Sequence, residues 1–377
     1  MAAGGSHVGD PFRRTTGTPG PAHPRHPCAV GGNVITVVRA GPLTTIQDQG
    51  RSGYAHLGVP RSGALDQWAL RRANALVGNP PHAAGLETTL LGCALRFERA
   101  AVVAVTGATA VLKLDKLPVT PRDGVIEVPA GSVLDIGRAA RGVRSYVAVA
   151  GGLDVELVLG SRSTDTLSGL GPPKLTDGTS LPIGDESGQF GPEVEFGARD
   201  EGRRDAAVRA ASRAVDNSAG GAAAGARAVD DGAPLGGSAG SVSPDVPGWA
   251  GEAAAAPEDQ EATAAGGDHI ELGVWLGPRD DWFDANELFS SEYQVSPMSN
   301  RVGCRLSGAA LPRIKTGELP SEGVVLGAIQ VPADGQPLIF LADHPTTGGY
   351  PVIGVVDDVN GLAQARPGST VRFRALD

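Results

Sequence analysis

Short runs of β-branched and apolar residues, bounded by Gly, Pro or Asp, recur along two stretches of this chain. Runs of this length and composition are typical of β-strands. The pattern predicts early strands at 34–38, 101–105, 110–114, 133–136 and 145–149, and late strands at 323–326, 338–341, 352–356 and 370–373. Many short strands joined by glycine turns favour barrels or sandwiches over a parallel sheet with crossover helices. We therefore expect a mostly β fold.

One segment has helical periodicity instead. Its apolar residues would share one face of a helix, and they are Leu65, Trp68, Ala69, Ala73 and Leu76. Asp66 falls in the first turn, where the helix dipole favours an acidic side chain. The sequence Gly-Asn-Pro at 78–80 then ends the periodicity. The pattern predicts a helix over 65–77.

Two other segments lack hydrophobic periodicity. Residues 1–32 are rich in Gly, Pro, His and Thr, and residues 197–267 are dominated by Ala, Gly, Asp, Glu and Ser. Such segments bury too little apolar surface to offset the entropy lost on ordering. We expect a disordered tail at 1–32, a first ordered segment at 33–196, a disordered insertion at 197–267 and a second ordered segment at 268–377.

Composition and charge narrow the class of protein. The net charge of -10 argues against a nucleic-acid-binding surface. Three widely spaced cysteines fit neither a disulfide framework nor a zinc site, and they suit a reducing compartment. The N-terminus lacks the apolar run of a secretory signal, and no stretch approaches the roughly 20 apolar residues of a membrane span. We expect a cytoplasmic protein with no nucleic-acid or membrane partner.

Two polar, glycine-rich segments in the first half carry candidate chemistry. The candidate residues of the segment 41–66 are Asp48, Arg51, Ser62 and Asp66. Turn chemistry explains them as well, because Asp and Ser bond to nearby backbone and Arg51 can pair with Asp48. Further along, Arg162 suits a bidentate contact to a carboxylate or phosphate. Its structural alternative is an ion pair with Asp154 or Asp165.

Two more polar segments lie in the second half. Their candidate donors and acceptors are Asn300, Arg301, Gln330, Asp343, Thr346 and Thr347, next to Gly348 and Gly349, whose bare backbone lets a substrate approach. The alternative is a long hairpin connection in which Asp343 caps its own turn. His344 is more typical of a structural histidine than of a general base. No Gly-x-Ser-x-Gly, Walker or metal-ligand spacing appears, so we expect no metal site and no self-contained hydrolase or ATPase.

Taken together, these segments resemble one family, the C subunit of bacterial 5-oxoprolinase (PxpC, also called KipA). This family is related to allophanate hydrolase subunit 2 and to the carboxyltransferase domain of urea carboxylase. The matching stretches are 41–66, 77–92, 145–171, 277–280, 295–308 and 322–350. The resemblance implies two cyclophilin-like β-barrel lobes and an obligate B subunit (PxpB, or KipI), often with an A subunit (PxpA). Such a complex uses ATP with Mg²⁺ and water to convert 5-oxo-L-proline to L-glutamate, ADP and phosphate.

The resemblance also implies roles for residues. It places substrate or oxyanion contacts on Arg51, Ser62, Asn300, Arg301, Gln330, Thr346 and Thr347, with Asp48, Asp66 and Asp343 as the catalytic or orienting carboxylates. The sequence departs from the family pattern at 343–345, which reads Asp-His-Pro where members usually carry Asp-Arg-Gln. It also departs at Cys304, where an aromatic residue is common, and in the long insertion.

Two other functions remain open at this point. The first is a component of a biotin-dependent carboxyltransferase similar to urea carboxylase. Because the chain lacks a Met-Lys-Met carrier signature, any biotin would arrive on another protein. The second is a non-enzymatic regulatory protein that binds a KipI-like partner.

Overall fold

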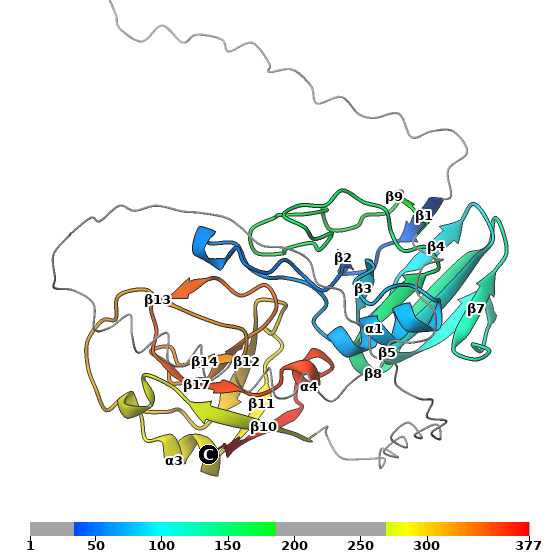
Figure 1. The fold of residues 1–377 in the computed structure, drawn as a ribbon. Coiled ribbons are helices and arrows are strands. Elements are labelled where there is room, and N and C mark those ends of the chain that lie inside the picture. Colours follow the sequence, from blue (N-terminus) through cyan, green and yellow to red (C-terminus); the bar gives the residue numbers. More distant parts are fainter. Residues whose placement is uncertain (1–33, 186–268, 377) are drawn as a thin grey trace, which may run out of the picture. The chain divides into compact units, whose positions relative to one another are not determined.

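The computed structural model describes residues 34–185 and 269–376, and these residues form two β lobes (Figure 1). The N-terminal lobe is a nine-stranded sheet and the C-terminal lobe is a closed barrel. The prediction of a mostly β fold with barrel-type lobes is confirmed. The tail predicted at 1–32 and the insertion predicted at 197–267 lie outside the described residues.

The N-terminal sheet is antiparallel throughout its paired strands. Its main path runs β2-β3-β8-β4-β1-β9, while β5 pairs with β8 and carries β6 and β7. The strands are β1 (Val34–Arg39), β2 (Thr44–Gln47), β3 (Gly85–Thr89), β4 (Ala94–Phe97), β5 (Ala101–Leu114), β6 (Leu117–Pro118), β7 (Val125–Val128), β8 (Val133–Val149) and β9 (Ser180–Pro182).

The strands β5 and β8 are longer than the sequence pattern predicts. Four short runs were expected, at 101–105, 110–114, 133–136 and 145–149, but each pair of runs belongs to one continuous strand. The ladder between β5 and β8 shifts register between Gly107 and Leu112 without ending. Such bulges bend a strand and interrupt its alternation, which explains why the pattern breaks where the strand does not.

The helix α1 (Gln67–Leu76) packs against β5 and β8. The predicted helix began at Leu65, but Asp66 is its N-cap, and the Asp66 side chain accepts a hydrogen bond from Ala69 N at 2.9 Å. Its buried residues are Ala69, Leu70, Ala73 and Asn74. The predicted apolar face is confirmed at Ala69 and Ala73 but is wrong at Trp68, which is 44% exposed. A short 3₁₀ helix, η1 (Ala55–Leu57), precedes α1 in the connection from β2.

The C-terminal barrel runs in the order β10-β17-β14-β15-β12-β11-β18 and closes through parallel pairing of β18 with β10. The barrel strands are β10 (His269–Leu276), β11 (Glu292–Val295), β12 (Gly303–Gly308), β14 (Ala328–Gln330), β15 (Leu338–Phe340), β17 (Val352–Val356) and β18 (Thr370–Ala375). Its other elements are η2 (Asp280–Trp282), α3 (Ala285–Ser290), α4 (Asn360–Ala363) and the small pair β13 (Glu322–Gly323) and β16 (Thr347–Gly348). The strand predicted at 323–326 is wrong beyond Gly323, because the following residues form a connection into β14.

Gln364, just after α4, joins the two lobes. Its Oε1 accepts hydrogen bonds from Val143 N and Arg144 N, both at 3.0 Å. Its Nε2 donates to Asp66 Oδ2 and to Arg144 O, also at 3.0 Å. One amide side chain thus bonds the barrel to β8 and to the N-cap of α1. Among the described residues, no helix has the length and apolar character needed to cross a membrane.

Candidate functional site

Arg301 is a buried arginine that bonds to carboxylates of both lobes. It lies just before β12, and 1% of it is exposed. Its Nε and Nη2 donate to the two carboxylate oxygens of Asp343, each at 2.9 Å. Its Nη1 donates to Glu87 Oε1 at 2.6 Å, and its Nη2 also reaches Gly63 O at 2.7 Å. With these bonds made to the protein, Arg301 is suited to hold the lobes and the loop at Gly63 in position.

Glu87 extends this cluster through the N-terminal lobe. It lies in β3 and is 1% exposed. Its Oε2 accepts from the Tyr146 hydroxyl at 2.8 Å and from Leu65 N at 3.0 Å. Arg144 Nε lies 3.6 Å from Glu87 Oε1. A buried carboxylate with this many partners is a fixed structural charge.

Burial and charge shift the pKa values of this cluster in opposite directions. Burial raises the pKa of Glu87 and of Asp343, but the positive charge of Arg301 and the hydrogen bonds to each carboxylate together outweigh it, so each pKa lies below its ordinary value. Burial raises the pKa of Asp66 above its ordinary value, although the hydrogen bond from Gln364 opposes that shift. Glu87 and Asp343 are therefore ionised partners of Arg301 at neutral pH rather than proton donors.

Asp343 and Asp48 organise loops of the N-terminal lobe. Asp343 Oδ2 accepts from Thr166 N at 3.0 Å and from Thr166 Oγ1 at 2.6 Å, in addition to its bonds with Arg301. The donors to Asp48 are Gly50 N at 2.7 Å, Ser161 Oγ at 2.7 Å, Ser163 Oγ at 2.5 Å and Arg162 N at 2.6 Å. Because these donors come from several loop segments, each carboxylate holds the loops that supply them in position. A catalytic role for either residue stays a prediction.

Arg51 contains a buried polar atom without a hydrogen-bond partner. It is 2% exposed, and its Nε and Nη2 donate to Val158 O at 3.3 Å and Ser163 O at 2.5 Å. Its Nη1 is buried and bonds to none of the described residues. Burial lowers the pKa of Arg51, while the charges of Asp165 and Asp48 oppose that effect. A buried guanidinium whose hydrogen bonds go to backbone carbonyls leaves a donor for an anionic ligand.

Ser62 is the second such residue. It is 2% exposed, its Oγ has no hydrogen-bond partner among the described residues, and its φ is 53°. Its backbone is fixed from both sides, because Ser62 N donates to Ala342 O at 3.0 Å and Arg51 N donates to Arg61 O at 2.8 Å. Residues held in a left-handed backbone conformation cluster at functional sites, so a buried serine with such a backbone and an unpaired hydroxyl is a candidate for function.

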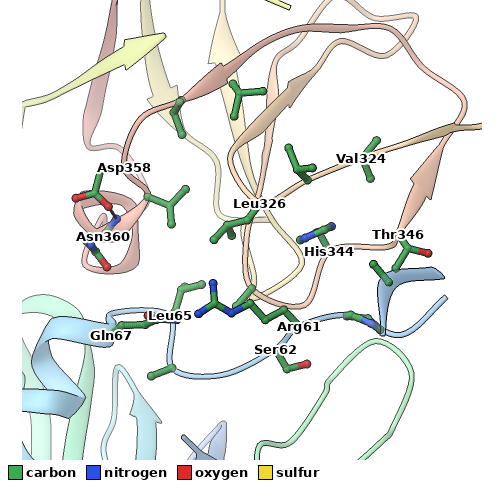
Figure 2. A pocket seen from close by; sticks show the side chains of 18 of the residues that line it. Arg61, Ser62, Leu65, Gln67, Val324, Leu326, His344, Thr346, Asp358 and Asn360 are labelled. Carbon is green, nitrogen blue, oxygen red and sulfur yellow. Dashed lines mark hydrogen bonds between the residues drawn. The ribbon is translucent and has the colours of Figure 1, made fainter. Parts of the chain in front are cut away.

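A cavity of about 440 Å³ lies between the segment 55–67 and the barrel (Figure 2). Most of its lining residues are apolar, and they come from both lobes. The polar residues among them include Arg61, Gln67, His344, Thr346, Asp358 and Asn360. Figure 2 shows the Ser62 hydroxyl directed away from His344, to the other side of the segment that forms the floor. Ser62 is itself among the residues that line the cavity.

Several predicted site residues have structural partners. Arg162 donates to Val155 O at 2.8 Å and pairs with Asp154 Oδ1 at 3.3 Å, as its structural alternative proposed. Asn300 is exposed and its Oδ1 accepts from the backbone N–H groups of residues 302 and 303, which is turn chemistry. Gln330 is buried and donates to Tyr350 O at 3.1 Å.

The glycine-rich turn after Asp343 is divided by the fold. Thr346 lines the cavity, whereas Thr347 and Gly348 form β16 and Gly349 is exposed. A Cβ at Gly348 would lie 2.6 Å from Gln330 Nε2, so this glycine permits close packing within the barrel. Substrate roles for these residues stay predictions.

Three residues of the site were missed from the sequence. Glu87 lies in one of the matching stretches, but the β3 sequence Gly-Leu-Glu-Thr-Thr gave no sign of an ion pair. Thr166, which bonds to Asp343, is one hydroxyl residue among several. His344 was set aside as a lone histidine, yet it lines the cavity. Within the described residues, no cluster of His, Cys, Asp and Glu is arranged to hold a metal ion.

Comparisons with known proteins identify the family. The family model "carboxyltransferase domain, subdomain A and B" matches residues 57–375. The chain belongs to this carboxyltransferase-domain family. It is 34% identical to the C subunit of the 5-oxoprolinase of Escherichia coli over 350 residues, which cover 90% of each chain.

Larger proteins contain the same unit. The chain is 30% identical to the urea amidolyase of Lachancea kluyveri over 92% of its own length, but it spans only 17% of that enzyme. Among solved structures, the urea amidolyase of K. lactis matches with a TM-score of 0.68 and 27% identity. That match covers 92% of this chain and 19% of the amidolyase. In the carboxyltransferase-domain family, this unit thus occurs both as a separate chain and within long multidomain chains.

Proposed function

We propose that this chain is the C subunit of an ATP-dependent 5-oxoprolinase. The observation that carries the proposal is the 34% identity to the corresponding subunit of the Escherichia coli enzyme, with 90% coverage of both chains. The proposed reaction opens the lactam of 5-oxo-L-proline. One water supplies a hydroxyl group to the carbonyl carbon and a proton to the leaving nitrogen, which gives L-glutamate. A second water is consumed as ATP becomes ADP and phosphate.

The proposed activity belongs to a complex. Because the Escherichia coli relative is one subunit of its enzyme, we propose a PxpB-like (KipI-like) partner and a PxpA-like partner for this chain. ATP with Mg²⁺ is then a substrate of the complex.

Within the complex we assign an anion-binding role to Arg51 and Ser62. Both reactants carry anionic groups, the carboxylate of 5-oxoproline and the phosphates of ATP. The unpartnered Arg51 Nη1 and Ser62 Oγ are buried donors available for such a group. Arg301 and Asp343 act as positioning residues, because Arg301 fixes the carbonyl of Gly63, next to Ser62, and Asp343 fixes the backbone at Thr166.

A second candidate function is a component of a biotin-dependent carboxyltransferase. The observation that favours it is the 30% identity to a urea amidolyase over 92% of this chain. In that case biotin would arrive on another protein and urea would replace 5-oxoproline. This is the weaker candidate, because the chain covers 90% of the oxoprolinase subunit but only 17% of the amidolyase.

The compound that stimulates ATP hydrolysis distinguishes the two candidate functions. The chain would be purified with the products of its neighbouring subunit genes, and phosphate release from ATP would be measured with 5-oxo-L-proline, with urea and with neither. The proposal predicts stimulation by 5-oxo-L-proline alone. Stimulation by urea that requires a biotinylated carrier would replace it with the carboxyltransferase.

A further inference from the structure

His344 offers an unused hydrogen-bond acceptor to the cavity between the lobes. Its Nδ1 lies 2.6 Å from Pro345 O. Because a carbonyl oxygen only accepts hydrogen bonds, Nδ1 carries the proton of the neutral ring. Nε2 is then left with a lone pair, and it makes no hydrogen bond to the described residues. Figure 2 shows the imidazole on the cavity wall opposite Arg61 and Ser62.

The surroundings of His344 keep this acceptor available. The side chain is buried, and burial lowers the pKa of His344, although the hydrogen bond to Pro345 opposes the shift. The charged groups that face it are Asp343, next in the chain, and Arg61, Asp357 and Asp358 on the cavity lining. At neutral pH the ring is therefore uncharged and Nε2 accepts a hydrogen bond from a ligand.

The rest of the lining suits a small ring. Apolar walls face each other across the cavity, from Val59, Pro60 and Leu65 on one lobe and Val324, Leu326 and Val355 on the other. The amide side chains of Gln67 and Asn360 add hydrogen-bond donors to the lining. A volume of about 440 Å³ falls within the range of small-molecule sites, which combine apolar walls with a few placed polar groups.

We propose that this cavity binds a small planar cyclic amide, with its ring between the apolar walls and its N–H donating to His344 Nε2. The proposal rests on the proposed function, because 5-oxo-L-proline is a lactam with such an N–H. It adds a binding site in the cavity and a specificity-determining residue, His344, on the wall opposite Arg61 and Ser62. The ring of a cyclic urea presents the same N–H and C=O pair, so the test must distinguish the two sources.

Ligand-observed NMR titration of the full chain tests the proposal with four probes. The probes are 5-oxo-L-proline, 2-pyrrolidinone, 2-imidazolidinone and N-methyl-2-pyrrolidinone. The first two are lactams, the third is a cyclic urea, and the last lacks the N–H. We expect the N-methyl compound to bind at least about tenfold more weakly than 2-pyrrolidinone, which corresponds to the loss of one hydrogen bond. Tighter binding of 2-imidazolidinone than of both lactams would assign the site to a cyclic urea.

Three substitutions locate the contact. His344→Asn keeps a donor near Pro345 O but loses the Nε2 acceptor, so it should weaken 2-pyrrolidinone binding about tenfold. His344→Gln places a side-chain carbonyl near the Nε2 position and should restore most of the affinity. Leu326→Trp fills the cavity and should abolish binding. Circular dichroism of each variant checks that the fold is retained.

Some outcomes would overturn the proposal. They are equal binding of the N-methyl compound, unchanged binding in His344→Asn or in Leu326→Trp, and no binding of any probe to the chain or to its complex. The proposed function fails differently, through the absence of 5-oxoproline-dependent ATP hydrolysis by the complete complex. Lactam binding at His344 without turnover would therefore retain the site and reject the oxoprolinase.

Discussion

Arg301 of the barrel and Glu87 of the N-terminal sheet form a fully buried ion pair, with Nη1 and Oε1 2.6 Å apart. The two residues are 214 positions apart in the chain. Asp343 binds the same guanidinium from the barrel side, so one positive charge holds two carboxylates from two lobes. This ion pair holds the two lobes together where the cavity and the segment around Ser62 lie.

Replacing Arg301 with Met should destabilise the protein severely. The substitution leaves Glu87 and Asp343 buried with their main counter-charge removed, and breaking a buried ion pair in this way costs about 3–5 kcal/mol. Urea unfolding followed by tryptophan fluorescence measures the loss. Arg305→Met is the matched control, because Arg305 is exposed on β12. Equal unfolding midpoints for the two variants would show that the buried cluster contributes no stability.

Acid should weaken the fold through the same cluster. The pKa values of Glu87 and Asp343 are lowered in the folded protein, so their stabilising effect is present above their unfolded pKa values, about 4, and is lost as pH falls through the lower folded values. Asp66 has a raised pKa and contributes in the opposite direction. Melting temperatures between pH 7 and pH 3 should fall more steeply for the native chain than for Glu87→Gln. Parallel curves would contradict this assignment.

Substitutions at Ser62 should lower activity without lowering stability. Ser62→Ala removes a buried hydroxyl that has no partner, and an unsatisfied buried hydroxyl costs about 1–3 kcal/mol, so the variant should be at least as stable as the native chain. Ser62→Gly also relieves the positive φ. If Ser62 Oγ binds an anionic group of a reactant, both variants should lower kcat/KM of the complex about tenfold or more while melting no earlier. Full activity in both would remove Ser62 from the site.

The contact between the two lobes should depend strongly on the Gln364 side chain. Gln364→Ala removes four hydrogen bonds and leaves Val143 N and Arg144 N without their acceptor. We expect a loss of about 2–4 kcal/mol, since each unpaired buried polar group costs about 1–3 kcal/mol. Gln336→Ala is the control, because the Gln336 side chain bonds to the exposed Gly308 backbone. Native-like unfolding of Gln364→Ala would show that the lobes are held elsewhere.

The sequence predicted local structure better than it predicted the site. Short β-branched runs and the period-3.6 pattern depend on neighbours in the chain, and they located α1 and the strands β1, β5, β8, β15, β17 and β18. They missed most of the shorter strands, including β2, β3 and β4. They divided β5 and β8 because the irregular ladder near Gly107 interrupts alternation without ending the strand. The partners of Arg301 could not be read this way, since Glu87 is brought to it by the packing of two lobes.

The candidate site residues could also not be told apart from structural residues by their local sequence. Arg51 and Ser62 were marked from their glycine-flanked loops, and both have buried polar atoms without partners among the described residues. Asn300 and Arg162 carry similar residue types in similar loops, yet the structure gives them turn and ion-pair partners. Residue type alone does not tell these cases apart. The difference depends on which donors are already bonded in the folded chain.

The most direct test of the proposed function is L-glutamate formation by the purified chain together with its B and A partner subunits. The reaction would contain 5-oxo-L-proline, ATP and Mg²⁺, and parallel reactions would each omit one subunit. The account predicts glutamate and ADP in equal amounts in the complete mixture, and no glutamate when this chain is left out. Glutamate formation at an unchanged rate without this chain, or none from a stable complete complex, would contradict it.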